Sequence, residues 1–220
     1  MNGLLEGILA IGALLVCVIP HEVAHGWVAY RLGDPTAKLM GRLSFNPLRH
    51  LDPIGSLLVP AFLLILQRLA GFPVVFGWAK PVPINPNYFR DPWRGMMWVG
   101  LAGPVTNFVM AIAVAGIGQG LVGLGLTSRW LLYFLALVVL ISLVLGIFNL
   151  IPVPPLDGSR VLVYFLPPYW RYRVARWERY GMWIVLGLLL IGGLGFVYRL
   201  AEGIFYRLVG FHWLALAGLL

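Results

Sequence analysis

Hydrophobic and polar positions follow one another along this chain in long blocks, and the longest apolar blocks have the length of membrane-crossing helices. The first, residues 3–32, is apolar over most of its length and ends before a Gly-Asp-Pro turn. Similar blocks cover residues 95–126, 130–150 and 180–200. A helix of about 20 apolar residues spans the hydrocarbon core of a bilayer. Together with shorter apolar stretches at 53–71 and 203–220, the pattern predicts an all-α polytopic membrane protein with five to six transmembrane helices.

The stretch between the first two long blocks departs from this pattern. Residues 53–71 are apolar but short, and two prolines and a glycine interrupt them. Residues 72–93 combine β-branched residues with prolines, which favours an edge strand or an extended loop over a helix. Lys and Arg residues cluster on either side of it and again later, in 31–49, 80–94 and 160–179, which hold 12 of the 16.

The basic clusters predict the topology. Because cytoplasmic loops carry an excess of Lys and Arg, we place the three clusters in the cytoplasm and the N-terminus outside. Both ends of residues 53–78 then lie on one side, so this segment is expected to be a re-entrant hairpin with an extended, β-like exit. Non-helical backbone at membrane depth is tolerated only against protein or water, so residues 53–86 are expected to line a cavity. The tail, 203–220, is either a final span or an interfacial helix.

Composition supports the membrane assignment. Hydrophobic residues make up 60% and charged residues 11% of the 220 residues, whereas roughly a quarter of an average soluble domain is charged. A net charge of +8 would be compatible with nucleic-acid binding, but in a membrane protein it follows from basic cytoplasmic loops. We treat 1–220 as a single domain, with a core of 1–165 and C-terminal helices in 166–220.

The first apolar block contains the sequence His21-Glu22-Val23-Ala24-His25. Side chains four residues apart lie on one face of a helix, one turn from each other. This spacing lets His21 and His25 bind one zinc ion, with Glu22 placed to act on a water molecule beside it. Left unpaired in a membrane segment these groups would cost several kcal/mol, which favours a metal site over a polar contact between helices.

A catalytic zinc has three protein ligands, and the third is sought among the remaining histidines and acids. His50 and His212 lie in a basic loop and in the tail, and most acids lie in loops or at helix ends. Asp157 instead follows an apolar block broken by prolines and precedes Gly158. It is the candidate third ligand, and it is also a candidate N-cap for a helix over 159–166. Cys17, one turn before His21, is either a fourth ligand or a buried structural cysteine.

Two asparagines in apolar surroundings are further candidates. Asn107 follows Gly103-Pro104 near the start of the block 95–126, and Asn149 precedes the prolines that lead to Asp157. A buried amide must find hydrogen-bond partners. These side chains therefore either bind a substrate backbone or reaction intermediate, or link neighbouring helices.

Together these motifs resemble the site-2 protease family of intramembrane zinc metalloproteases, over roughly residues 1–165. The resemblance rests on His21 to His25, on Gly103-Pro104-Val105-Thr106-Asn107, and on Asn149 to Gly158. Phe76 to Val82 and Asn46-Pro47 are similar to the small bacterial branch that has no PDZ domain.

The resemblance implies a zinc metalloendopeptidase that cleaves peptide bonds within or near transmembrane segments of membrane-protein substrates. One Zn²⁺ per chain would be held by His21, His25 and Asp157, with Glu22 as the general base. Asn107 and Asn149 would contact substrate or intermediate. The protein would be a multi-pass protein of the cell (inner) membrane, with its site toward the cytoplasm. The extended stretch 72–86 would hold an unwound substrate by strand addition.

The competing interpretation is a non-catalytic zinc-binding membrane protein or a metal transporter. Such a protein needs metal ligands but no base beside them. Glu22 is therefore the residue that separates the two interpretations.

Overall fold

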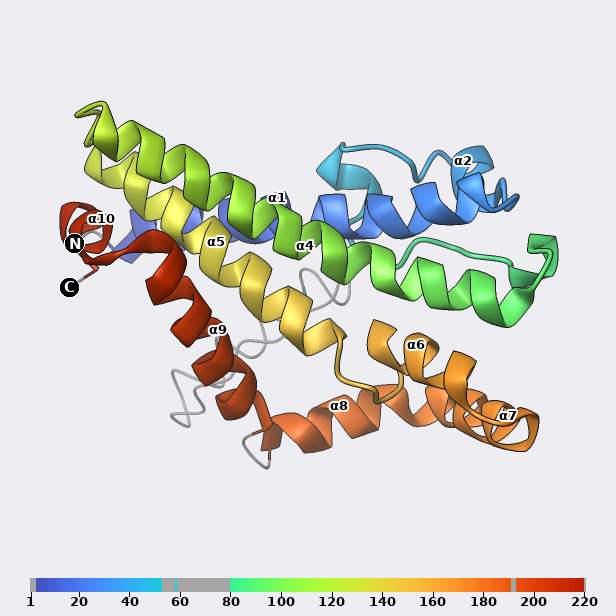
Figure 1. Cartoon of the computed structure of the whole chain (residues 1–220). Coiled ribbons are helices and arrows are strands. Elements are labelled where there is room, and N and C mark those ends of the chain that lie inside the picture. Colours follow the sequence, from blue (N-terminus) through green and yellow to red (C-terminus); the bar gives the residue numbers. More distant parts are fainter. Residues whose placement is uncertain (1–2, 53–57, 59–79, 191–192, 220) are drawn as a thin grey trace.

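The computed structural model describes residues 3–52, Leu58, 80–190 and 193–219, and the regular structure of this part is helical (Figure 1). Within it, three helices are long and apolar enough to cross a membrane: Leu4–Arg31, Pro92–Gly123 and Arg129–Asn149. The expected all-α membrane fold is confirmed, and the protein is an integral membrane protein. The count of five to six spans stays a prediction. No strand occurs among the described residues, and the expected hairpin over 53–78 lies almost entirely outside them.

Helix α1, Gly3–Arg31, matches the predicted first block and runs on through Pro20. Proline has no N–H, so the helix lacks one hydrogen bond just before the histidine pair. Ala13 and Cys17 on this helix are fully buried against Val138. The contact joins the N-terminal half of α1 to the middle of the bundle. The half from His21 onward packs against a different neighbour.

That neighbour is α4, Pro92–Gly123, which packs against both α1 and α5, Arg129–Asn149 (Figure 1). Helix α4 begins sharply because Asp91 Oδ1 accepts hydrogen bonds from the backbone N–H groups of Trp93 and Arg94, each at 3.1 Å. Pro92 follows at the first helical position, where its missing N–H has no cost. The two predicted blocks 95–126 and 130–150 are thereby confirmed as helices.

The second half of the chain forms shorter helices: α6 (Asp157–Phe165), α7 (Pro168–Trp177), η4 (Glu178–Tyr180), α8 (Gly181–Leu190), α9 (Gly193–Val209) and α10 (Phe211–Ala217). The sequence predicted a break before residue 203, but α9 continues to Val209 and the chain turns at Gly210, where φ is +77°. The boundary was wrong because α9 is amphipathic. Its buried side chains recur every fourth residue: Val197, Ala201, Phe205 and Val209. They form one apolar face that continues along the helix although charged residues interrupt the sequence between them.

Two irregular segments are joined beside α1. The first, from residue 34, contains α2 (Thr36–Leu39) and η1 (Pro47–Arg49), and the second runs from 80 to η3 (Pro86–Tyr88). The fully buried Asp34 accepts a hydrogen bond from Asn85 N at 2.7 Å. Arg42 donates to the carbonyls of Lys80 at 2.5 Å and Pro81 at 3.2 Å. These charge-assisted bonds fix residues 80–85 next to the middle of α1.

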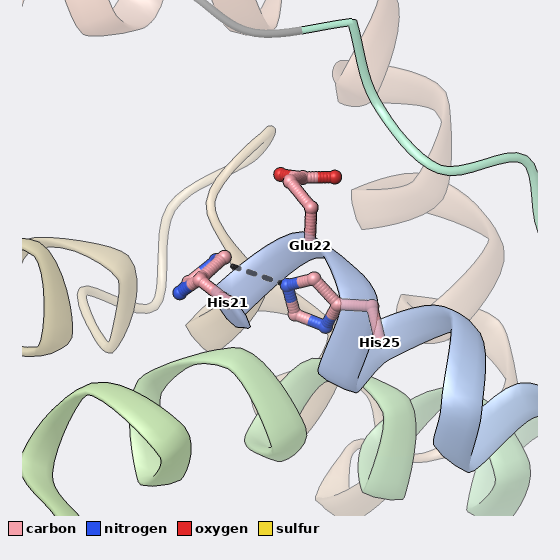
Figure 2. A group of neighbouring side chains, drawn as sticks. All are labelled: His21, Glu22 and His25. Carbon is pink, nitrogen blue, oxygen red and sulfur yellow. Dashed lines mark hydrogen bonds between the residues drawn. The ribbon is translucent and has the colours of Figure 1, made fainter. Parts of the chain in front are cut away.

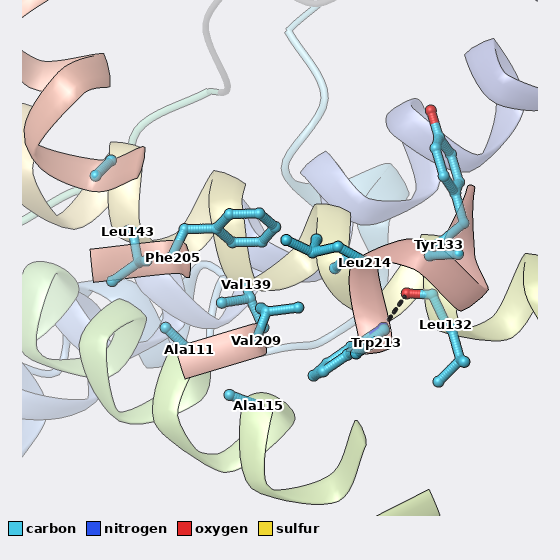
Figure 3. Close-up of a cluster of buried hydrophobic side chains, with 13 residues drawn as sticks. Ala111, Ala115, Leu132, Tyr133, Val139, Leu143, Phe205, Val209, Trp213 and Leu214 are labelled. Atoms are coloured by element: carbon cyan, nitrogen blue, oxygen red, sulfur yellow. Dashed lines mark hydrogen bonds between the residues drawn. The ribbon is translucent and has the colours of Figure 1, made fainter. Parts of the chain in front are cut away.

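The main apolar core lies where α4, α5, α9 and α10 meet (Figure 3). Trp213 of α10 is its largest fully buried side chain. The Trp213 indole N–H donates to the carbonyl of Leu132 at 3.0 Å, and its ring lies against Gly118 of α4. A glycine at 118 is therefore what allows the indole to reach the helix backbone.

We expect Gly118→Ala to destabilise the protein, because the new methyl group would overlap the Trp213 ring. Overpacking of this kind costs about 1–3 kcal/mol, which lowers the unfolding temperature by several degrees. Gly120→Ala on the same helix is the matched control, since a Cβ there meets nothing within 4 Å. Thermal unfolding in detergent measures both variants. Equal unfolding temperatures would contradict the packing described here.

Candidate active site

Two imidazole rings from α1 form the centre of the site (Figure 2). His21 and His25 are 6% and 4% exposed, and their Nε2 atoms lie 3.0 Å apart. The rings meet edge to face, with centroids 4.6 Å apart. The i, i+4 spacing thus places both rings on one helical face, as predicted.

Asp157, the first residue of α6, reaches the same point. Its Oδ2 lies 3.2 Å from Nε2 of His21 and 3.2 Å from Nε2 of His25. The alternative N-cap role is not seen, because Asp157 lies inside the helix and its carboxylate faces the histidines. Arg160 Nη1 lies 3.5 Å from the other oxygen, Oδ1. The three residues predicted as one group are therefore together, although they come from distant parts of the chain.

The electrostatics of Asp157 favour a carboxylate. Burial by itself raises the pKa of this carboxyl group, but hydrogen bonds from His21 and His25 and the positive charge of Arg160 outweigh it and hold the pKa below its usual range. An ionised oxygen that faces two ring nitrogens is the form that can bind a metal ion.

The three facing atoms fit a zinc ion. Zinc takes imidazole nitrogen and carboxylate oxygen at about 2.0–2.1 Å in tetrahedral geometry, which requires ligand atoms about 3.3 Å apart. The separations between the two Nε2 atoms and Oδ2, 3.0, 3.2 and 3.2 Å, are close to this value. Two neutral imidazoles and one carboxylate leave one tetrahedral position open, as in catalytic zinc sites.

Helix α4 supports both rings from behind. His25 Nδ1 lies 2.7 Å from the carbonyl oxygen of Val99, so Nδ1–H donates to that oxygen. Nε2 offers its lone pair to a metal ion once it has given up the proton that it shares with Asp157. His21 Nδ1 lies 3.1 Å from the amide of Asn107, which is fully buried. Both contacts join the ring atom that points away from Asp157 to a fixed partner, which is the usual arrangement behind metal-binding histidines.

Glycines allow α4 to come this close. A Cβ at Gly103 would lie 2.5 Å from both His21 Cε1 and His25 Nε2. A Cβ at Gly100 would lie 2.8 Å from the backbone oxygen of Asp157. In the sequence, Gly103 stands out only as part of a motif, and Gly100 and Val99 carry no signal of their own that places them at the site. The i, i+3, i+7 spacing of Gly100, Gly103 and Asn107 is the signal that could have found this face.

Glu22 points away from the face on which the two rings pack against α4 (Figure 2). One of its carboxylate oxygens nevertheless lies within 4.8 Å of ligand atoms of both histidines. Its Oε2 accepts a hydrogen bond from the backbone N–H of Val82 at 3.1 Å. The distance to the histidines leaves room for one water molecule between the carboxylate and the metal-binding atoms.

Two other candidates have local partners. Asn149 is the last residue of α5, and its amide donates to the Leu145 carbonyl in the same helix at 3.1 Å. Cys17 Sγ lies 3.2 Å from Ser142 Oγ and 3.5 Å from the Val138 carbonyl of α5. Cys17 therefore packs between α1 and α5, as the structural interpretation expects.

Comparison with known proteins extends these observations. The model of Peptidase family M50 matches residues 120–192. YwhC of Bacillus subtilis, provisionally named as a zinc metalloprotease, is 39% identical over 187 residues, which cover 83% of this chain and 80% of YwhC. Rip2 of Mycolicibacterium smegmatis, named in the same way, is 32% identical over 83% of this chain and 67% of its own length.

A more distant relative comes from an archaeon. The zinc metalloprotease MJ0392 of Methanocaldococcus jannaschii is 28% identical over 149 residues, 68% of this chain and 32% of that protein. No solved structure shows significant similarity. The HExxH sequence with its buried histidine pair, the fit to zinc and the relatives that cover most of the chain lead to one conclusion. The chain belongs to peptidase family M50, the site-2 protease family, and is a zinc metalloprotease that hydrolyses peptide bonds.

Proposed function

We propose that this protein is an intramembrane metalloendopeptidase, which cleaves membrane-protein substrates within or near their transmembrane segments. The observation that carries the proposal is the convergence of His21, His25 and Asp157 inside a bundle of candidate membrane spans. A peptide bond must come to such a site within the bilayer, or at its boundary, to be cut. Membership of family M50 supports the same class of substrate.

In this proposal His21, His25 and Asp157 hold one Zn²⁺ per chain. Zinc, when bound, makes water acidic enough to attack at neutral pH and polarises the peptide carbonyl. Glu22 accepts the proton from the attacking water and passes it to the leaving amine. The Val82 N–H holds the Glu22 carboxylate in place, and Asn149 is proposed to contact substrate at the end of α5.

The geometry supports a different role for Asn107. Its amide faces His21 Nδ1, and its Oδ1 has no described partner. If Nε2 binds the metal, Nδ1 carries the proton and needs an acceptor, so the amide oxygen must be the atom that faces it. Rotation of the amide by a half-turn provides this contact. We therefore propose Asn107 as a positioning residue for His21.

We also propose that the site faces the cytoplasm in the cell (inner) membrane, as the basic clusters indicate. The end of α1 at Arg31 and the start of α4 at Pro92 lie at one end of the bundle (Figure 1). The basic clusters 31–49 and 80–94 begin or end at these two helix ends. Strand addition of a substrate to residues 72–86 stays a proposal, and Val74 and Phe76, at which proline substitution would test it, lie outside the described residues.

We expect Glu22→Gln to abolish cleavage while zinc stays bound, because the amide cannot accept the proton but leaves the three ligands intact. General acid–base catalysis contributes about 10²–10⁴-fold, so fragments of membrane proteins should disappear from the proteome. Fragment proteomics of cells with the wild type or the variant, and zinc content of the purified proteins, provide the measurements. Equal fragment levels with the wild type and the variant would contradict the role of Glu22 as general base.

We expect Gly103→Ala to weaken zinc binding, because the methyl group would displace both imidazole rings. Gly116→Ala on the same helix is the control, since its Cβ would meet nothing within 4 Å. Competition with a zinc-sensitive dye measures both affinities. Equal affinities would show that the rings are not held against α4 when they bind metal.

Asn107→Leu is expected to lower zinc affinity about 10–100-fold, the usual effect of losing a partner behind a metal-binding histidine. Asn107→Asp should retain the affinity, because a carboxylate oxygen also accepts a hydrogen bond from Nδ1–H. A residue that binds only substrate would give a different result. Its leucine variant would keep the zinc affinity and change only the cleavage kinetics.

A further inference from the structure

Helix α7 and the turn η4 carry a concentration of arginine and aromatic residues that the proteolytic site does not use. Residues 168–180 contain four arginines and one glutamate, a formal charge of +3, together with five tryptophans and tyrosines. Tyr169, Trp170, Tyr172, Trp177 and Tyr180 are between 48% and 63% exposed. An exposed aromatic surface of this size needs a partner or an interface.

Three of the arginines line one cavity. Its volume is about 310 Å³, and its walls are formed by Trp170, Arg173, Arg176, Trp177, Arg179 and Tyr180. Positions 170, 173, 177 and 180 follow helical spacing, so the cavity opens on a single face. The Arg173 guanidinium stacks on the rings of Tyr169 and Trp170, and Arg179 stacks on Tyr180.

The segment that forms this cavity has more arginines than acids, with four arginines and one glutamate in residues 168–180. The carboxylate ion pairs of the described residues involve Asp157, and none of them includes Arg173, Arg176 or Arg179. Three guanidinium groups around one space repel one another unless an anion lies between them. Guanidinium groups bind phosphate through two parallel hydrogen bonds, so a phosphate-bearing ligand fits this cavity.

Helix α7, which forms most of the cavity, packs beside the start of a candidate membrane span. Trp93, in the first turn of the candidate span α4, contacts Tyr172 edge to face at 5.5 Å, and Arg171 lies over the Trp93 ring at 5.8 Å. The uncharged helix α8 follows η4 directly. Tryptophan and tyrosine gather at membrane–water interfaces, and arginines there meet lipid headgroups.

We propose that Arg173, Arg176 and Arg179 form a binding site for the headgroup phosphate of an anionic phospholipid. The aromatic rings hold the guanidinium groups extended and lie at headgroup depth. The bound lipid would fix α7 to the bilayer surface beside the start of α4. This site is separate from the metal-binding residues and does not depend on the protein's catalytic activity.

The test is native mass spectrometry of the purified full chain in neutral detergent with equal amounts of phosphatidylglycerol and phosphatidylcholine. We expect a retained phosphatidylglycerol molecule, and at least about tenfold less of it in R173Q/R176Q/R179Q. The matched control is R31Q/R90Q/R94Q, which removes the same charge from exposed arginines at the same end of the bundle. An unchanged unfolding temperature verifies that each variant is folded.

Three results would overturn the proposal. The first is equal retention of the two lipids by the wild type. The second is an equal loss in both triple variants, which would mean diffuse attraction and not a site. The third is displacement of the lipid by excess inorganic phosphate, which would identify a site for a soluble anion.

Discussion

The structure depends on placing three polar side chains inside an apolar helix bundle without leaving any of them unpaired. Each would be costly alone at this depth. His21, His25 and Asp157 solve the problem by facing one another, at separations that also suit a metal ion. Helix α4 completes the arrangement, because its glycines have no side chain and its backbone can therefore lie directly against the rings. The same contacts thus hold the helices together and bring the three metal-binding atoms to one point.

This constraint explains why the sequence indicated that His21, His25 and Asp157 would lie together. Two histidines one turn apart, and one aspartate after a proline-broken helix, have few alternatives in a chain with four histidines and eight acids. The supporting contacts were not predictable in the same way. Val99 contacts His25 through its backbone carbonyl, which every residue type has. Its role therefore depends only on where α4 crosses α1.

The fold, too, could be predicted from the sequence only in part. Long apolar blocks gave the bounds of α1, α4 and α5 to within a few residues. A span needs about 20 consecutive apolar residues, so its ends fall where polar residues and turns begin. The end of α9 was misplaced because its buried face continues past Arg199 and Glu202, and only the packing partner reveals that face. Buried loop contacts such as that of Asp34 with Asn85 join segments that local sequence does not relate.

The hydrogen bond between Val82 and Glu22 has a consequence for register. Val82 stands between Pro81 and Pro83, neither of which has a backbone N–H. Of these three residues only Val82 can donate to the carboxylate. A slip of the segment by one position in either direction would place a proline opposite Glu22 and leave its oxygen without this donor. The two prolines therefore restrict the segment to one register along α1.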